Sequence, residues 1–92
     1  MIICAAIRVK AKATKEEIHV CGLRHGDCYT TLRYVKFPQD HTLTEGFITH
    51  ENVFLDRKDA FCHACACGQL SPTAKIYKTE QGEDELYSED LW

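Results

Sequence analysis

The length of this chain, 92 residues, restricts its fold most, because so short a chain forms one domain with a small core. Domains of this size often gain stability from disulfides, a bound metal or association of subunits. The composition is that of an ordinary folded domain, with 45% hydrophobic and 27% charged residues. We therefore expect a single domain over residues 1–92 that is stabilised by one of these means.

Six cysteines are the first candidates for such stabilisation. The start of the chain lacks the pattern of an export signal, so we expect a reducing compartment and free, buried thiols. Cys62, Cys65 and Cys67 lie close together in the sequence, and a Cys-x-x-Cys pair can supply half of a zinc site. The second pair that would complete such a site is missing. Core cysteines on a helix are therefore favoured, and neither a metal nor a cofactor is predicted.

Apolar patterns predict a small sheet. Residues 1–10 are apolar and β-branched, and residues 17–22 alternate between polar and apolar, so the two segments together indicate a hairpin. Residues 46–49 and 53–55 are two further short strands separated by a turn. Residues 74–77 are expected to form one more.

Two short helices are also predicted. Asp27 is a suitable N-cap for the first, whose apolar side begins at Cys28. Asp56 is a suitable N-cap for the second, and Gly68 stands where a glycine ends a helix. The sequence therefore predicts an α+β fold, a small antiparallel sheet with two short helices, built as an oligomer.

The net charge of −3 is unevenly distributed. Residues 79–92 contain six acids and no base, whereas eleven bases against eight acids leave residues 1–78 with a net charge of +3. The acidic C-terminal tail at 79–92 also carries apolar and aromatic residues, so we expect it to dock on the body or on a neighbouring subunit; a solvated tail is the alternative. The basic body suits a small anion but not duplex nucleic acid, which needs a concentrated basic face.

Arg24 and His25 are candidate ligand-binding residues. They belong to the segment Leu23-Arg-His-Gly26, which resembles the Arg-His-Gly motif of histidine phosphatases. The long parallel fold of that family is missing, so no catalytic residue is predicted. Arg24 suits phosphate and His25 can stack or donate a hydrogen bond. The alternative is that Arg24 pairs with an acid of the tail.

A second group of candidates follows Gly46. Phe47 can stack under a base, Asn52 can bind ring edges, and Arg57 lies near helix N–H groups that favour phosphate. The alternative is that Phe47 and Phe54 belong to the core and that Arg57 is solvated. The sequence leaves this choice open.

Several segments follow one another in a familiar order. They are the apolar first strand, Val20-Cys-Gly-Leu-Arg-His25, Glu45-Gly-Phe47, Phe54-Leu-Asp-Arg57, Gly68-Gln69 and Leu86-Tyr-Ser-Glu-Asp-Leu91. With them the chain resembles, over nearly its whole length, the small bacteriophage proteins of the first-described Thoeris anti-defence family. That resemblance implies a small antiparallel sheet with two helices and symmetric oligomers built from dimers, with a hexamer as one option.

The resemblance also implies a function. Members of that family bind cyclic ADP-ribose isomers made by bacterial immune TIR enzymes, and some hold cyclic di- or trinucleotides; they sequester the signal intact. Arg24, Phe47 and Arg57 match segments associated with ligand or packing, and Lys75 stands where a basic residue reaches phosphate. The chain departs from the family in its cysteine-rich helix and in having no arginine after Gly68, which leaves the exact ligand open.

We therefore expect a non-enzymatic phage protein that acts in the cytoplasm of the infected bacterium. It binds a cyclic nucleotide as a homo-oligomer, through Arg24, His25, Phe47, Asn52, Arg57 and Lys75. The alternatives are an inhibitor that binds a host protein through the acidic tail and a small zinc-binding protein. No membrane contact is expected, since no apolar stretch approaches the roughly 20 residues that cross a bilayer.

Overall fold

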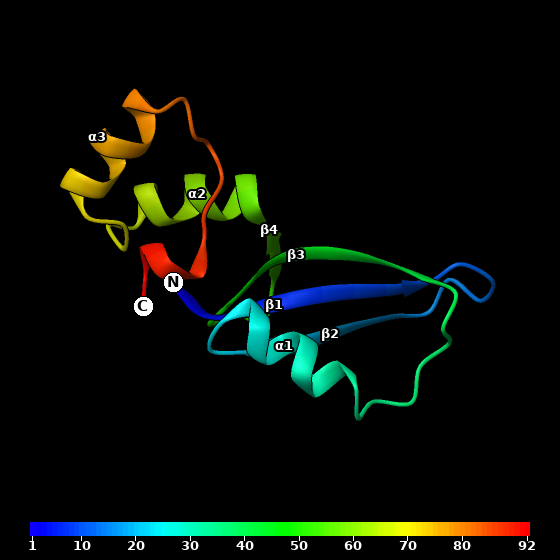
Figure 1. The fold of residues 1–92 in the computed structure, drawn as a ribbon. Helices are drawn as coiled ribbons and strands as arrows, with labels where there is room; N and C mark the ends of the chain where they lie inside the picture. Colours follow the sequence, from blue (N-terminus) through cyan, green and yellow to red (C-terminus); the bar gives the residue numbers. More distant parts are fainter.

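The fold is a four-stranded antiparallel sheet with α1 and α2 on one face and α3 farther out beyond α2, and the computed structural model describes residues 1–92 (Figure 1). The elements in chain order are β1 (Ile2–Ala11), β2 (Glu17–Gly22), α1 (His25–Leu32), β3 (His41–Thr49), β4 (Phe54–Asp56), α2 (Arg57–Ala66), α3 (Pro72–Glu80) and the short 3-10 helix η1 (Ser88–Asp90). The strand order is β2-β1-β3-β4. The predicted α+β class is confirmed, with three α-helices in place of two.

The strand β1 lies inside the sheet, between β2 and β3, and one of its faces is apolar and buried. It pairs with β2 in the predicted hairpin, from Ala5 to Lys10, and with β3 from Ile2 to Ala11. The strand predicted at 46–49 is the end of the longer β3, because β1 offers main-chain partners as far as Ala11. No helix of the structure has both the length and the apolar character needed to cross a membrane.

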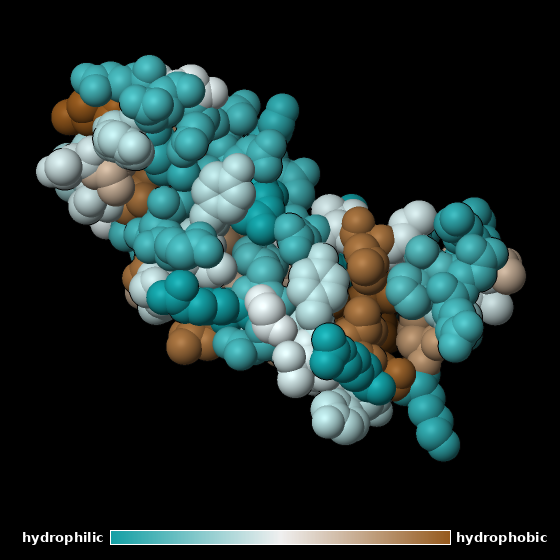
Figure 2. All heavy atoms as spheres, viewed as in Figure 1, coloured by the Kyte–Doolittle hydropathy of each residue, from teal (hydrophilic) through white to brown (hydrophobic).

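The core lies between the sheet and the helices. Ala5, Ile7 and Val9 point to this side from alternate positions of β1, and all three are fully buried. The helices and the remaining segments add Cys28, Phe47, Ala60, Ala64, Leu70 and Leu86 to the same cluster. The helix α1 is only 8 residues long, and a band of hydrophobic side chains stays visible beside it (Figure 2).

Two helix boundaries show what the local sequence encodes. The helix α1 begins at His25 with Arg24 as its N-cap, so the predicted N-cap, Asp27, is wrong. Asp27 is the third helical residue, and its Oδ2 accepts a hydrogen bond from the Arg24 amide at 3.1 Å. The predicted N-cap of α2 is confirmed, since Asp56 Oδ1 accepts from the Asp59 amide at 2.9 Å.

The strand predicted at residues 74–77 is wrong, because residues 72–80 form α3. Ser71 is its N-cap and accepts a hydrogen bond from the Ala74 amide at 3.1 Å. Pro72 occupies the first helical turn, where an N–H has no intrahelical partner to lose. Pro72 therefore belongs to the start of a helix.

The opposite face of the sheet carries no helix. Arg8 and Lys10 point to this open face, since they alternate with the buried positions of β1. Gly46 of β3 also lies on it, and a Cβ built there would come within 2.6 Å of Phe54 Cζ. The ring of Phe54 therefore lies across the space that a side chain at Gly46 would fill.

We predict that Gly46→Ala lowers the free energy of unfolding by about 2 kcal/mol or more, because overpacking forces the backbone to move. The new Cβ would lie 2.1 Å from the main-chain oxygen of Leu55, so β4 has to shift away. Urea denaturation measures the change. Gly26→Ala is the control, since nothing lies within 4 Å of its Cβ. Alanine favours the helix, so this control is expected to gain about 0.5 kcal/mol. Equal stability of the two variants would contradict the prediction.

Candidate functional site

The C-terminal segment, residues 81–92, packs on the body of this chain. Leu86 is fully buried, and its amide donates to the main-chain oxygen of Arg57 at 2.9 Å. Leu91 and Trp92 are partly buried against the core. The segment runs from α3 past the start of α2 to the beginning of β1 (Figure 1). It is therefore an integral part of the fold.

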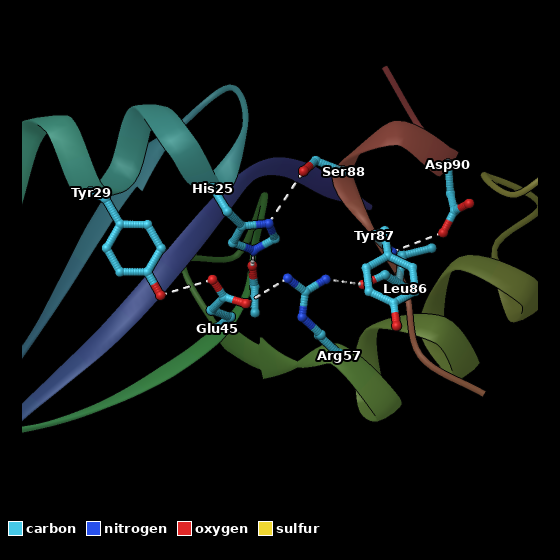
Figure 3. Close-up of polar contacts among 9 residues, drawn as sticks. His25, Tyr29, Glu45, Arg57, Leu86, Tyr87, Ser88 and Asp90 are labelled. Atoms are coloured by element: carbon cyan, nitrogen blue, oxygen red, sulfur yellow. Dashed lines mark hydrogen bonds and ion pairs between the residues drawn. The ribbon is translucent and has the colours of Figure 1, made fainter. Parts of the chain in front are cut away.

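Arg57, the first residue of α2, joins β3 to the C-terminal segment (Figure 3). Its Nη2 donates to Glu45 Oε1 at 2.7 Å, and its Nη1 donates to the main-chain oxygen of Leu86 at 2.9 Å. The guanidinium carbon also lies 4.6 Å from the ring centroid of Tyr87. Only 17% of the side chain is exposed, so its charge is used mainly within the chain.

Glu45, on β3, receives a second hydrogen bond from the Tyr29 hydroxyl at 2.8 Å. Burial raises the pKa of Glu45, but the hydrogen bonds from Arg57 and Tyr29 and the charge of Arg57 lower it more, so the pKa lies below its usual value. Burial and the bond to Glu45 raise the pKa of Tyr29 to about 12. Near neutral pH, Glu45 therefore stays charged and Tyr29 stays a neutral donor.

The start of α1 contacts the same segment. His25 is only 8% exposed; its Nε2 donates to the Gly46 carbonyl oxygen at 2.8 Å, and its Nδ1 lies 3.2 Å from Ser88 Oγ. The Arg24 guanidinium donates to the main-chain oxygen of Trp92. The structure thus brings Arg24, His25 and Arg57 together around the C-terminal segment.

Lys78 is a buried cation that the sequence analysis did not identify. Its Nζ lies 2.9 Å from Asp90 Oδ2 and 3.2 Å from Glu83 Oε2, and 4% of the side chain is exposed. Burial lowers the pKa of Lys78, but the bonds to the two carboxylates raise it more, so the pKa lies above its usual value. The sequence signal was the acidic tail following α3, which did not reveal which lysine faces it.

A pocket of about 590 Å³ opens beside Arg57, where β3, α2 and the C-terminal segment meet. Its lining consists of Tyr29, Leu43, Thr44, Glu45, Asp56, Arg57, Lys58 and Glu85. Three of these residues are acids and two are bases, which gives a net charge of −1. The pocket is therefore polar and of mixed charge, with Glu85 contributed by the C-terminal segment.

Phe47, Asn52 and Lys75 lie apart from this pocket. Phe47 is fully buried, with its ring 5.1 Å from that of His25. Asn52 is exposed in the turn between β3 and β4 with a φ of 62°, a conformation that asparagine tolerates. Lys75 is exposed on α3, in a groove of about 330 Å³ next to Ile76.

The cysteines form neither disulfides nor a metal site. All six are free, and no group of three or more His, Cys, Asp or Glu side chains is placed to hold a metal ion. Cys28 is buried, but Cys21, Cys62 and Cys67 are exposed. The expectation of buried thiols is therefore wrong for these three, because Cys21 lies on the open face of β2, Cys62 lies on the outer side of α2, and Cys67 follows the end of that helix.

Comparison with known proteins gives one match. A family model described as phage T4 y16D protein matches residues 1–92, which includes the sheet, the helices and the C-terminal segment. No curated protein and no solved structure matches the chain.

We predict that Lys78→Met lowers the free energy of unfolding by about 2 kcal/mol, since breaking a buried ion pair leaves carboxylates without a counter-charge. Lys75→Met, on the same helix, is the matched control. Lys75 is exposed, so its replacement should change stability by less than about 0.5 kcal/mol. Urea unfolding followed by Trp92 fluorescence measures both. A loss that is equal in the two variants would show that Lys78 is not a buried anchor.

We also predict a specific pH dependence for Glu45. Because its pKa is lower in the folded chain, its stabilising contribution is present above the unfolded value of 4.5 and is lost as the pH falls through the folded pKa. Glu45→Gln should therefore reduce stability at neutral pH and flatten the loss of stability below pH 4.5. Urea denaturation over this range measures it, with Glu16→Gln, an exposed acid, as control. Parallel curves for the Glu45 variant and the unmodified chain would contradict the prediction.

Proposed function

We propose that this chain, which belongs to the phage T4 y16D protein family, acts inside the infected cell as a binding protein that sequesters a cyclic nucleotide signal without cleaving it. The signal is a cyclic ADP-ribose isomer or a cyclic oligonucleotide, and its capture keeps a bacterial defence effector inactive. This is the role of the first-described Thoeris anti-defence family, which the sequence resembles. The pocket beside Arg57 is the observation that carries the proposal.

The size and lining of the pocket support a nucleotide ligand. Its volume of about 590 Å³ falls within the range of small-molecule sites, roughly 300–1,000 Å³. The carboxylates of Asp56 and Glu85 can accept hydrogen bonds from ribose hydroxyls and base amino groups. Lys58, on a flexible stem, supplies a charge for phosphate. The pocket thus offers partners for each part of such a ligand.

Two groups of the pocket, Glu45 and Tyr29, keep one protonation state near neutral pH. General acid–base catalysis is most efficient when the pKa of the catalytic group lies near the working pH. The pKa of Glu45 lies below its usual value, and that of Tyr29 is raised to about 12, so neither group exchanges a proton readily at neutral pH. Fixed charges suit a protein that holds its ligand and releases it unchanged.

The charge balance supports the contribution of a second subunit. A pocket of net charge −1 in one chain repels a diphosphate, so retention of the ligand requires further cations. On α3, Ile76 and Tyr77 are 60% and 63% exposed beside Lys75. A contact between copies through α3 would cover these apolar groups. We therefore include a homo-oligomer in the proposal.

Lys58→Gln tests the proposed pocket directly. Lys58 is 68% exposed and its one ion pair, with Asp84, spans 3.8 Å, so the fold should tolerate the change. Loss of a charge-assisted hydrogen bond is expected to weaken the ligand about tenfold or more. Lys12→Gln is the matched control, since Lys12 is 58% exposed and pairs with Asp40 at 3.5 Å outside the pocket. Calorimetric titration with cyclic ADP-ribose isomers and cyclic di- and trinucleotides measures both affinities.

Two further outcomes decide between classes of function. Ligand released by heating must be recovered intact, because a hydrolysed product would identify an enzyme. A ligand that binds only the folded state must stabilise it. If none of these ligands raises the thermal stability of the chain, the proposal that it sequesters a cyclic nucleotide fails.

A further inference from the structure

The open face of the sheet carries a cluster of flat side chains that the pocket does not use: Arg8 of β1, His19 of β2 and Phe54 of β4, called here the open-face cluster. The imidazole of His19 stacks on the ring of Phe54, with centroids 5.1 Å apart and planes 30° apart. The guanidinium of Arg8 lies 5.1 Å from the Phe54 centroid. Arg8 and His19 are also direct neighbours in the register of β1 and β2. The three flat groups therefore pack against one another on the open face.

The position of the Phe54 ring depends on the missing side chain of Gly46. Phe54 belongs to the edge strand β4, and its ring reaches across β3 because Gly46 has no side chain. Ala6, the partner of Gly46 on β1, is fully buried. Because Gly46 leaves this space free, the ring extends along the sheet toward Arg8 and His19. The platform is thus preorganised before any ligand binds.

The cluster is accessible and its existing contacts are weak. The side chains of Arg8 and His19 are 40% and 31% exposed. Glu17 lies 3.8 Å from Arg8 Nε and 3.3 Å from His19 Nε2. Exposed ion pairs of this kind contribute about 1 kcal/mol or less. Arg8 can therefore exchange Glu17 for a phosphate at little cost.

The charge around the cluster favours an anion. Residues 8–17 hold four bases and two acids, a net charge of +2 in a chain whose total is −3. Lys10 lies on the same face as Arg8, and Lys12 and Lys15 follow in the hairpin turn. The acidic C-terminal segment lies at the other end of the molecule (Figure 1). Arg8 and Lys10 thus lie on the open face between the stacked rings and the basic hairpin turn.

We propose that the open-face cluster binds single-stranded nucleic acid. Bases stack on Phe54 and His19, and phosphates pair with Arg8 and Lys10. Aromatic side chains displayed on a sheet beside cations bind single strands because unpaired bases expose their π-faces, whereas the bases of a duplex are already stacked and paired. This site is separate from the pocket beside Arg57, and it does not depend on the proposed sequestration of a cyclic nucleotide.

Fluorescence anisotropy with labelled 12-nucleotide oligouridine and oligothymidine tests the proposal. The unmodified chain should bind, and more weakly as salt increases, because bound phosphates release counterions. Phe54→Leu keeps an apolar group over Gly46 but removes stacking, so affinity should fall about tenfold, whereas Phe54→Tyr should keep it. Arg8→Gln should weaken binding and reduce the salt slope by about one. Arg33→Gln, an exposed arginine after α1, is the matched control and should bind as the unmodified chain does.

The two oligonucleotides distinguish the source of the strand. Tighter binding of oligouridine assigns the site to RNA, since the 2′-hydroxyl is then recognised, and equal binding assigns it to the shared chemistry of base and phosphate. Failure of the unmodified chain to bind either oligonucleotide at low salt would overturn the proposal. So would unchanged affinity in a folded Phe54→Leu variant, or an equal loss in Arg33→Gln. A stable dimer that covers the open face, and so leaves no strand bound, would also overturn it.

Discussion

The packing of the C-terminal segment depends on two hydrogen bonds between Arg57 and Leu86. The guanidinium of Arg57 binds Glu45 of β3 and the main-chain oxygen of Leu86, while its own main-chain oxygen accepts from the Leu86 amide. Hydrogen bonds to charged groups are among the stronger ones in proteins, about 1.5–3 kcal/mol each. The same residue thus sets the end of the sheet, the start of α2 and the path of the last residues. Because Glu85 follows that path, the pocket has its outer wall only when the segment is docked.

The structure shows how the basic body and the acidic C-terminal segment contact each other. Arg24, Arg57 and Lys78 each bind the C-terminal segment, so the basic body is partly neutralised by the chain's own end. Two of the surfaces that remain accessible differ in charge. The pocket keeps a mixed lining with a slight excess of acid, and the open face keeps a slight excess of base. The two surfaces therefore suit ligands of different chemistry, and neither depends on the other.

Local signals in the sequence predicted the local structure well. The hairpin, the Asp56 cap and the left-handed Gly68 follow from alternation, capping chemistry and backbone freedom. Asp27 misled because an acid is favoured both as an N-cap and in the first helical turn. The prediction of a strand at 74–77 was wrong because a serine followed by a proline can mark the start of a helix as well as the end of one.

The partners of the candidate site residues could not be read from the sequence. His25 and Ser88 are 63 positions apart, and Arg24 and Trp92 are 68 apart, so only the folded topology brings them together. The side chains next to Gly46 alternate between the two faces of the sheet, but the sequence did not show which of these faces the helices cover. That choice makes Phe47 a core residue and leaves Phe54 on the open face, half-buried and accessible.

Hydrogen exchange at the Leu86 amide tests the central claim most directly. If the segment is docked through Arg57, this amide opens only with the global unfolding of the chain. Its exchange, followed by NMR, should then be as slow as that of the Ile7 amide in the middle of β1. Exchange of Leu86 at the rate of an unstructured peptide, while Ile7 stays protected, would show that the segment is not held and would remove the wall of the pocket.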